Sequence, residues 1–122
     1  MEQDYFFDTY AIIEIMEKSI SYEKFKDFKI TTSVLNVGEI YNIILREKGK
    51  ENADEWFKNY SFELLEITPD VIVKATYFRY LNKSKNISST DAVGYFLSLK
   101  HNLKFLTGDR QFENLANVEF VK

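Results

Sequence analysis

The sequence predicts an α/β fold with a mostly parallel central sheet of four to five strands and helices on both faces. Short apolar or alternating segments, typical of strands, take turns with segments in which apolar residues recur every three or four positions, as on one face of a helix. This alternation favours parallel strands, because each strand is followed by a helix that crosses over the sheet. The chain has 122 residues, of which 45% are hydrophobic and 29% charged. We therefore expect a single globular domain spanning residues 1–122.

Apolar patterning and helix-end signals place the elements of the first half of the chain. Hydroxyl side chains just before amphipathic segments are typical N-caps, and Gly49 suits the left-handed conformation that often ends a helix. The predicted elements are, in order, a strand at 5–7, a helix capped by Thr9, a helical turn at 22–28, a strand at 29–31, a long helix capped by Thr32 or Ser33 and reaching about residue 48, and a helix at 51–60.

The second half shows the same alternation with clearer boundaries. The only proline, Pro69, follows Thr68 and suits the first turn of a helix, where its missing N–H leaves no helical hydrogen bond unmade. The predicted elements are, in order, a strand at 62–67, a helix at 69–83, a strongly patterned helix at 88–101, a buried strand at 103–106 and a final strand at 118–121.

Composition excludes several classes of function. The chain has no cysteine, so disulfides, thiolate catalysis and thiolate metal sites are ruled out. Its net charge of −3 argues against a protein that coats polyanions. The apolar runs are far shorter than the roughly 20 residues of a membrane span, and the acidic Glu2 and Asp4 after Met1 are unlike a secretory leader. We expect a cytoplasmic protein that does not associate with membranes.

Two acidic residues come just after predicted strands. Asp8 follows the strand at 5–7 directly, and Asp109 follows the strand at 103–106 after Thr107 and Gly108. In open α/β sheets functional groups gather beyond the carboxyl ends of the strands, so both carboxylates fall at that edge if the two strands are parallel neighbours. The alternative for each is a carboxylate that favours a helix N-terminus through the helix dipole.

Asp91 and Glu39 are less specific, because each sits within a predicted helix. Asp91 fits the N3 position of a capping box with Ser88, which is the simpler interpretation. One turn on, Gly94 lowers helix stability and leaves room for another backbone or a substrate. Glu39 lies at the edge of an apolar stripe after the small Gly38, although glutamates in amphipathic helices are usually solvated.

The four carboxylates gain meaning together. A cluster of acids from separate elements is costly, since like charges repel and burial penalises each of them, unless a cation offsets the charge. Mg²⁺ and Mn²⁺ prefer oxygen ligands, and such ions activate water and stabilise charge that develops on a phosphodiester.

The chain resembles PIN-domain ribonucleases in the size range of the VapC-like toxins, over nearly its whole length. The resemblance rests on four segments, of which the last is the most specific: Phe6-Phe7-Asp8-Thr9, Asn36-Val37-Gly38-Glu39, Ser89-Thr90-Asp91-Ala92-Val93 and Leu106-Thr107-Gly108-Asp109-Arg110-Gln111-Phe112. It implies a PIN-like fold, a Mg²⁺- or Mn²⁺-dependent endoribonuclease, an antitoxin protein as partner, and a homodimer formed through helices in the first half of the chain.

The resemblance also implies roles for individual residues. The catalytic set would be Asp8, Glu39, Asp91 and Asp109, and the metal ligands would be Asp8, Asp91 and Asp109, with Glu39 as a further ligand or a group that orients water. The Thr107 hydroxyl would orient a carboxylate or a water. One departure is Gln111, where family members often carry another acid, so the resemblance supports one metal position better than two.

Three further points stay open at this stage. Arg110, beside the predicted site, is the best candidate for an RNA contact. The chain is rich in aromatic residues (11 Phe, 8 Tyr and 1 Trp), most of which we expect in the core, although one or two could stack on RNA bases. The competing function is a non-catalytic or RNA-processing binding module whose acidic pocket docks a basic partner segment.

Overall fold

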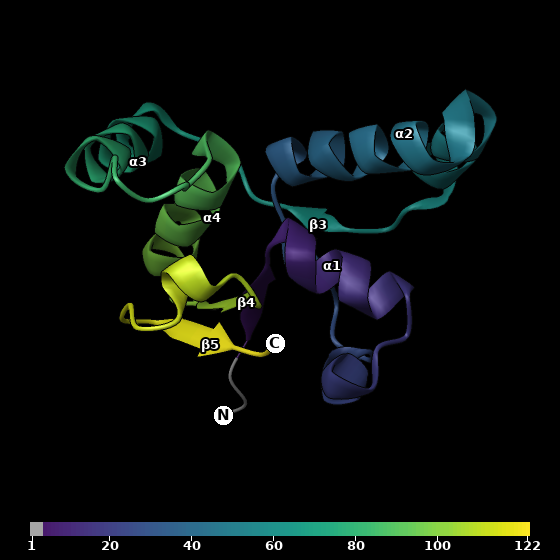
Figure 1. The fold of residues 1–122 in the computed structure, drawn as a ribbon, viewed down its shortest axis with the longest axis horizontal. Helices are drawn as coiled ribbons and strands as arrows, with labels where there is room; N and C mark the ends of the chain where they lie inside the picture. Colours follow the sequence, from purple (N-terminus) through teal and green to yellow (C-terminus); the bar gives the residue numbers. More distant parts are fainter. Residues whose placement is uncertain (1–3) are drawn as a thin grey trace.

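The computed structural model describes residues 4–122, so the expectation drawn from Met1 and Glu2 lies outside the described residues. The elements of the first half are β1 (Tyr5–Phe7), α1 (Thr9–Met16), the 3₁₀ helix η1 (Ile20–Phe25), β2 (Thr31–Thr32), α2 (Val34–Asn59) and β3 (Glu63–Leu64). Those of the second half are α3 (Pro69–Leu81), α4 (Ser89–Lys100), β4 (Lys104–Thr107), the 3₁₀ helix η2 (Arg110–Phe112) and β5 (Val118–Phe120). Figure 1 shows α3 and α4 on one side of β1 and β4, and α1 and α2 on the other.

Every strand pairing is parallel, as predicted, but the strands form two sheets within the described residues. One sheet has the order β1-β4-β5 and the other joins β2 to β3. The expectation of one sheet with four to five strands was therefore wrong in its count. Strands β2 and β3 have two residues each, and β2 meets β1 through a side chain instead of a backbone ladder: the Thr32 hydroxyl donates to the Phe7 carbonyl oxygen at 2.8 Å.

The three-stranded sheet separates two apolar layers. Side chains alternate along a strand, so Phe6 and its cross-strand partner Phe105 enter the cluster formed with α3 and α4. Phe7 and its partner Leu106 enter the cluster formed with α1, η1 and α2. All four side chains are fully buried. Each contributes about 1.5–3 kcal/mol by leaving water, so both layers fix the position of β1 and β4.

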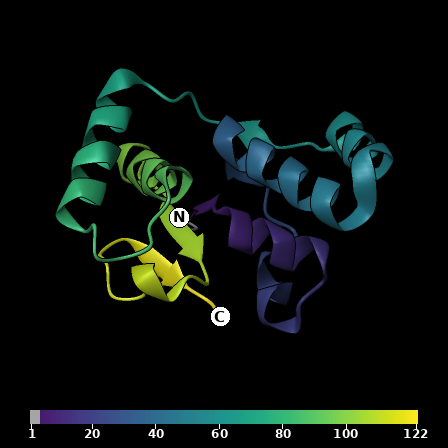
Figure 2. The ribbon, with the colours of Figure 1, turned by 45° about the horizontal axis from the view of Figure 1, so that its top comes forward.

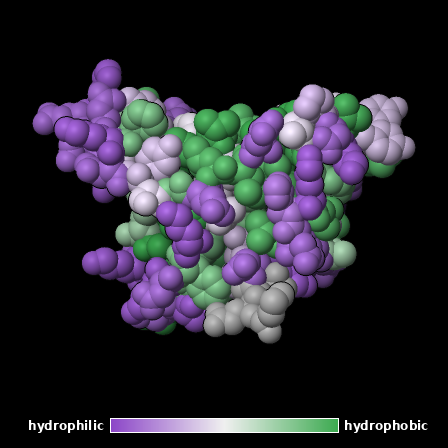
Figure 3. Space-filling view, turned by 180° about the vertical axis from the view of Figure 1, so that it is seen from behind, coloured by the Kyte–Doolittle hydropathy of each residue, from purple (hydrophilic) through white to green (hydrophobic). Residues whose placement is uncertain are grey.

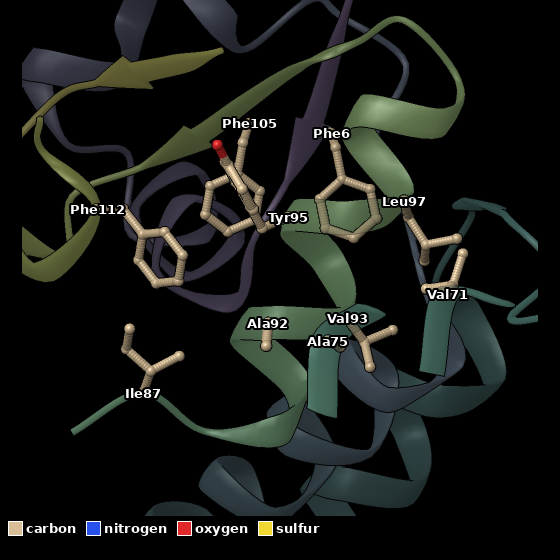
Figure 4. Packing of buried hydrophobic residues seen from close by; sticks show 10 residues of the cluster. All are labelled: Phe6, Val71, Ala75, Ile87, Ala92, Val93, Tyr95, Leu97, Phe105 and Phe112. Carbon is tan, nitrogen blue, oxygen red and sulfur yellow. The ribbon is translucent and has the colours of Figure 1, made fainter. Parts of the chain in front are cut away.

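The first layer explains a glycine that sequence reasoning interpreted differently. Figure 4 shows Phe6, Phe105 and Tyr95 within this cluster, beside α4. A Cβ atom added to Gly94 would lie 2.8 Å from Cε1 of Phe6 and 3.2 Å from Cε1 of Phe105. The small residue thus makes room for two core rings. We had expected it to leave room for a substrate or another backbone instead.

Helix boundaries follow the predicted signals with one clear shift. The long helix breaks at Gly49 as predicted, but with a φ of +85° and a ψ of 173°, a conformation open to glycine that differs from the left-handed helical one. Figure 2 shows α2 changing direction before its last turns. Pro69 begins α3 as expected. The N-cap of α1 is Asp8 and not Thr9, which is the first residue of the helix. In residues 4–122 no helix is both long and apolar enough to cross a membrane.

Candidate functional site

The carboxyl ends of β1 and β4 meet at an open pocket. Asp8 follows β1 and Asp109 follows β4, and these strands are parallel neighbours. Asp91 reaches the same pocket from the first turn of α4. The cavity measures about 390 Å³ and is lined by Asp8, Tyr10, Asp91, Gly108, Asp109, Arg110 and Lys122. Three of the four acids singled out in the sequence are therefore brought together.

Asp8 is the most buried of the acids, with 3% of its surface exposed. Its Oδ1 accepts a hydrogen bond from the Ala11 N–H at 2.8 Å, so the side chain caps α1. Burial raises the pKa of Asp8 to about 8, although hydrogen bonds from Thr107 and Ala11 oppose the shift; Asp91 and Asp109 add to it by repulsion. Without a cation, this carboxyl group carries a proton at neutral pH. Asp8 therefore serves both as helix cap and as a wall of the pocket.

Asp91 likewise combines the two interpretations considered for it. The Ser88 hydroxyl oxygen accepts from the Asp91 N–H at 3.0 Å, and Asp91 Oδ2 accepts from the Ser88 N–H at 3.4 Å, which completes the predicted capping box. Burial raises the pKa of Asp91, the bonds with Ser88 oppose this, and repulsion from Glu39 and Asp109 adds to it. The cap fixes the carboxylate at the helix N-terminus, where it faces the pocket.

Thr107 connects the two acids at the strand ends. It is fully buried, its hydroxyl oxygen accepts from the Asp109 N–H at 3.0 Å, and its side chain is hydrogen-bonded to Asp8. Asp109 in turn accepts from the Gln111 N–H at 3.0 Å and begins η2. One side chain thus links the segments that follow β1 and β4 at the pocket, and the orienting function of Thr107 stays a prediction.

Glu39 stands beside the pocket and belongs to a chain of side-chain hydrogen bonds. Thr9 donates to Glu39 Oε1 at 2.5 Å, Asn36 Nδ2 donates to the Thr9 hydroxyl oxygen at 3.1 Å, and Ser33 donates to Asn36 Oδ1 at 2.6 Å. Ser33 and Asn36 are buried. Glu39 also interacts electrostatically with Asp91. Sequence reasoning missed Asn36 as a support of the site, although its spacing of three from the helix-capping Ser33 was visible.

Gln111 does not line the pocket. Its Oε1 accepts from the Asn86 N–H at 2.6 Å, and its Nε2 donates to the Asn86 carbonyl oxygen at 2.8 Å. From the other side, Arg79 donates to the Ile87 carbonyl oxygen at 2.9 Å and to the Ser89 hydroxyl at 3.0 Å. Both ends of the Gln111 amide thus hold the segment that leads into α4 and Asp91. A carboxylate could accept from Asn86 but could not donate to it.

Two pocket residues were not singled out in the sequence. Tyr10 stands on the first turn of α1, and its ring packs against Gly108, where an added Cβ atom would lie 2.1 Å from Cε1 of the ring. Burial raises the pKa of Tyr10, Glu14 and Asp8 add to the shift, and Arg110 opposes it. Lys122 follows β5. The position of Tyr10, two residues after Asp8 at a helix start, was the signal available for it.

The donor set suits a hard divalent cation. The pocket offers carboxylate oxygens, which are the ligands that Mg²⁺ and Mn²⁺ prefer. Asp8 holds a proton where a cation could replace it. As the side chains stand, no three His, Cys, Asp or Glu residues within 4–122 form a group ready to hold a metal ion. Asp8 and Asp91 are engaged in helix capping, so ligation would require these side chains to share or exchange those bonds.

Fold and pocket define a small α/β domain with carboxylates from separate elements at the carboxyl edge of a parallel sheet. The sequence profile of the PIN domain matches residues 5–118, and the chain belongs to this family. No curated protein matches the sequence significantly.

Solved structures share the fold at low sequence identity. A toxin–antitoxin complex from Klebsiella pneumoniae is similar with a TM-score of 0.71 and 15% identity, over 96% of each chain. The toxin VapC20 from Mycobacterium tuberculosis, described as cleaving the sarcin–ricin loop, has a TM-score of 0.74 and 16% identity, over 98% of this chain and 100% of its own. VapBC2 from Rickettsia felis, bound to a promoter DNA fragment, has a TM-score of 0.71 and 17% identity with the same coverage.

Proposed function

We propose that the protein is a Mg²⁺- or Mn²⁺-dependent endoribonuclease that hydrolyses RNA phosphodiester bonds, and that it acts in the cytoplasm as the toxin of a toxin–antitoxin pair. The observation that carries the proposal is the convergence of Asp8, Asp91 and Asp109 on one pocket. Burial of a carboxyl group that is neutral without a cation adds to it. Membership of the PIN family and the toxin neighbours support the same class of activity.

The residues of the pocket would have separate functions in hydrolysis. Asp8, Asp91 and Asp109 would hold the ion, and Glu39 would serve as a further ligand or orient the water. Thr107 would orient the Asp8 carboxylate through its side chain, and its hydroxyl oxygen accepts from the backbone N–H of Asp109. When bound, a divalent ion would lower the pKa of a coordinated water and offset the charge developing on the phosphodiester. Attack of water on phosphorus with departure of the 3′ oxygen leaves a 5′-phosphate and a 3′-hydroxyl group.

Cleavage of RNA by the purified protein tests the catalytic proposal. Asp8→Asn and Asp91→Asn keep the capping oxygens but remove a charged ligand, so each should lower the cleavage rate by at least about 100-fold. Glu51→Gln, an exposed carboxylate on α2, is the matched control and should leave the rate unchanged. Undiminished cleavage by either Asp variant would overturn the assignment.

Metal binding gives a readout that is independent of cleavage. Calorimetry with Mn²⁺ should detect binding, with release of a proton near pH 7, because Asp8 is protonated in the metal-free protein. Asp8→Asn should remove the proton release. No binding at millimolar Mn²⁺ would favour the competing function, a non-catalytic module whose acidic pocket docks a basic segment.

An antitoxin partner and a homodimer complete the proposal. The Klebsiella pneumoniae neighbour is a toxin–antitoxin complex, and the Rickettsia felis neighbour is VapBC2 bound to promoter DNA, which supports the antitoxin partner. Apolar side chains are exposed on α2 and α3, among them Val34, Phe57, Val73, Tyr77 and Tyr80. Figure 3 shows hydrophobic residues in the upper middle of the rear face, flanked by hydrophilic residues toward the two upper corners. Such surfaces support protein contacts, and light scattering of the purified protein tests the dimer.

A further inference from the structure

Three residues that line the pocket have no function in the proposed metal-dependent hydrolysis. Tyr10, Arg110 and Lys122 line the pocket together with the acids, yet none of the three is a metal ligand. They come from three separate parts of the fold, namely the start of α1, η2 and the segment after β5. An aromatic ring and two cations next to a carboxylate cluster are the groups that contact a base and its flanking phosphates.

The ring of Tyr10 is held in place. Its neighbour Gly108 leaves no room for a side chain between them, and the ring of Tyr22 lies behind with centroids 6.3 Å apart. Tyr22 is itself fully buried and donates to the Val121 carbonyl oxygen at 2.5 Å. A fixed, partly exposed ring can receive a stacked base with little loss of side-chain freedom.

The two cations remain available to phosphate groups. Among residues 4–122, the ion pair of Arg110 is a single long and exposed one, between its Nη1 and Glu113 Oε1 at 3.6 Å, which stabilises little. Lys122 forms no ion pair with another residue in the part of the chain that the structure describes. Because Asp91 and Asp109 repel phosphates, cations at the rim are needed to admit an RNA strand.

We propose that this pocket binds one unpaired nucleotide of a single-stranded RNA segment, with its base against Tyr10 and its flanking phosphates on Arg110 and Lys122. The inference deepens the proposed ribonuclease function and rests on it. A cavity of about 390 Å³ is of the size of small-ligand sites and accommodates one nucleotide. A base still paired within a duplex cannot present its face to the Tyr10 ring, so the substrate must be unpaired at this point.

Binding of labelled RNA to the Asp91→Asn variant in Mg²⁺ tests the inference without cleavage. Tyr10→Leu should weaken binding of a single-stranded oligoribonucleotide by about 5- to 150-fold, whereas Tyr10→Phe should stay within about twofold. A hairpin stem of the same composition should bind less tightly and should not respond to Tyr10→Leu. An equal affinity of Tyr10→Leu and Tyr10→Phe for the single strand would overturn the assignment.

The cations are tested through salt dependence. Arg110→Gln and Lys122→Gln should each reduce the slope of log affinity against log salt by about 0.7. Lys50→Gln, an exposed residue just after the break in α2 that does not line the pocket, is the matched control and should not change the slope. Unchanged slopes in both pocket variants would contradict phosphate contacts at these residues.

Competition with small molecules keeps the inference testable if Tyr10→Leu does not fold. A nucleoside monophosphate should displace the labelled RNA from protein with an intact Tyr10 at lower concentration than ribose 5-phosphate, because only the former has a base to stack. Equal competition would contradict the base contact. Persistent cleavage by the Asp91→Asn variant would instead contradict the proposed catalytic function, and the Tyr10 variants would then be compared by RNA binding in EDTA.

Discussion

The two sides of the pocket are held by different kinds of interaction. Asp8 and Asp109 are placed by the neighbouring strands β1 and β4, whose backbone ladder and buried side chains fix them, and Thr107 ties them together. Asp91 and Glu39 depend on side chains from distant segments, through the Gln111 contact with Asn86 and the hydrogen bonds to Thr9. The strand side is therefore held by many backbone and core contacts at once, whereas the other side rests on a few side-chain hydrogen bonds.

The largest expected effect concerns Asp8, on the side of the pocket that the strands hold. It is a change in the free energy of unfolding with pH. The pKa of Asp8 is about 8 in the folded protein and near 4 when unfolded, so the folded state binds the extra proton. In the metal-free protein, the contribution of Asp8 to the free energy of unfolding should be greatest below pH 4. The protein should lose up to about 5 kcal/mol of this free energy as the pH rises to 8. Urea denaturation in EDTA at several pH values measures this loss.

Asp8→Asn provides the comparison for that measurement. The variant keeps an oxygen for the Ala11 N–H but has no proton to lose, so it should be more stable than the original protein at pH 8 and gain little at pH 5. A stability difference that does not change with pH would contradict the burial argument.

Gln111→Glu tests the side of the pocket that side-chain hydrogen bonds hold. It should have the next largest effect on stability. The carboxylate cannot donate to the Asn86 carbonyl oxygen and places charge beside it, which should cost about 1–3 kcal/mol. Hydrogen exchange should become faster in residues 84–90, with little change in β1 and β4. Glu113→Gln is the control on the same stretch of chain. If Gln111→Glu leaves exchange unchanged and tightens Mn²⁺ binding, the residue belongs to the metal site after all.

Thr9→Val should have a smaller effect on stability, of about 1 kcal/mol, because it replaces one hydroxyl by a methyl group of similar size. It also leaves Glu39 without its donor and Asn36 without its acceptor. Cleavage should fall by about tenfold, within the usual range for a residue that supports a ligand, and Thr9→Ser should restore it. Full activity of Thr9→Val would show that Glu39 needs no such support.

Gly38→Ala is the smallest change and concerns the residue next to Glu39. Nothing lies within 4 Å of the added Cβ atom, so the variant should stabilise α2 by about 0.5–1 kcal/mol and leave cleavage unaltered. Thermal unfolding measures the gain. A loss of activity would mean that the small residue next to Glu39 serves a substrate or a moving side chain.

The same difference explains which features could be predicted from the sequence. Asp8 and Asp109 were placed correctly at one edge because strand ends are visible as local patterns, and the capping box of Asp91 spans only four residues. Gln111 was first interpreted as a missing acid, since its partner Asn86 lies 25 residues away and nothing local indicates the contact. The division into two sheets also escaped prediction, because a hydroxyl and not a ladder joins β2 to β1.

Strand β1 is only three residues long, and its last two side chains face opposite layers of the core immediately before Asp8. A shift of the chain by one residue would exchange the two phenylalanine layers and turn Asp8 away from Thr107. Such a slip is opposed by every contact of Phe6 and Phe7. The packing of the hydrophobic core therefore determines where the first carboxylate lies. Substitutions deep in either layer should change the geometry of the pocket.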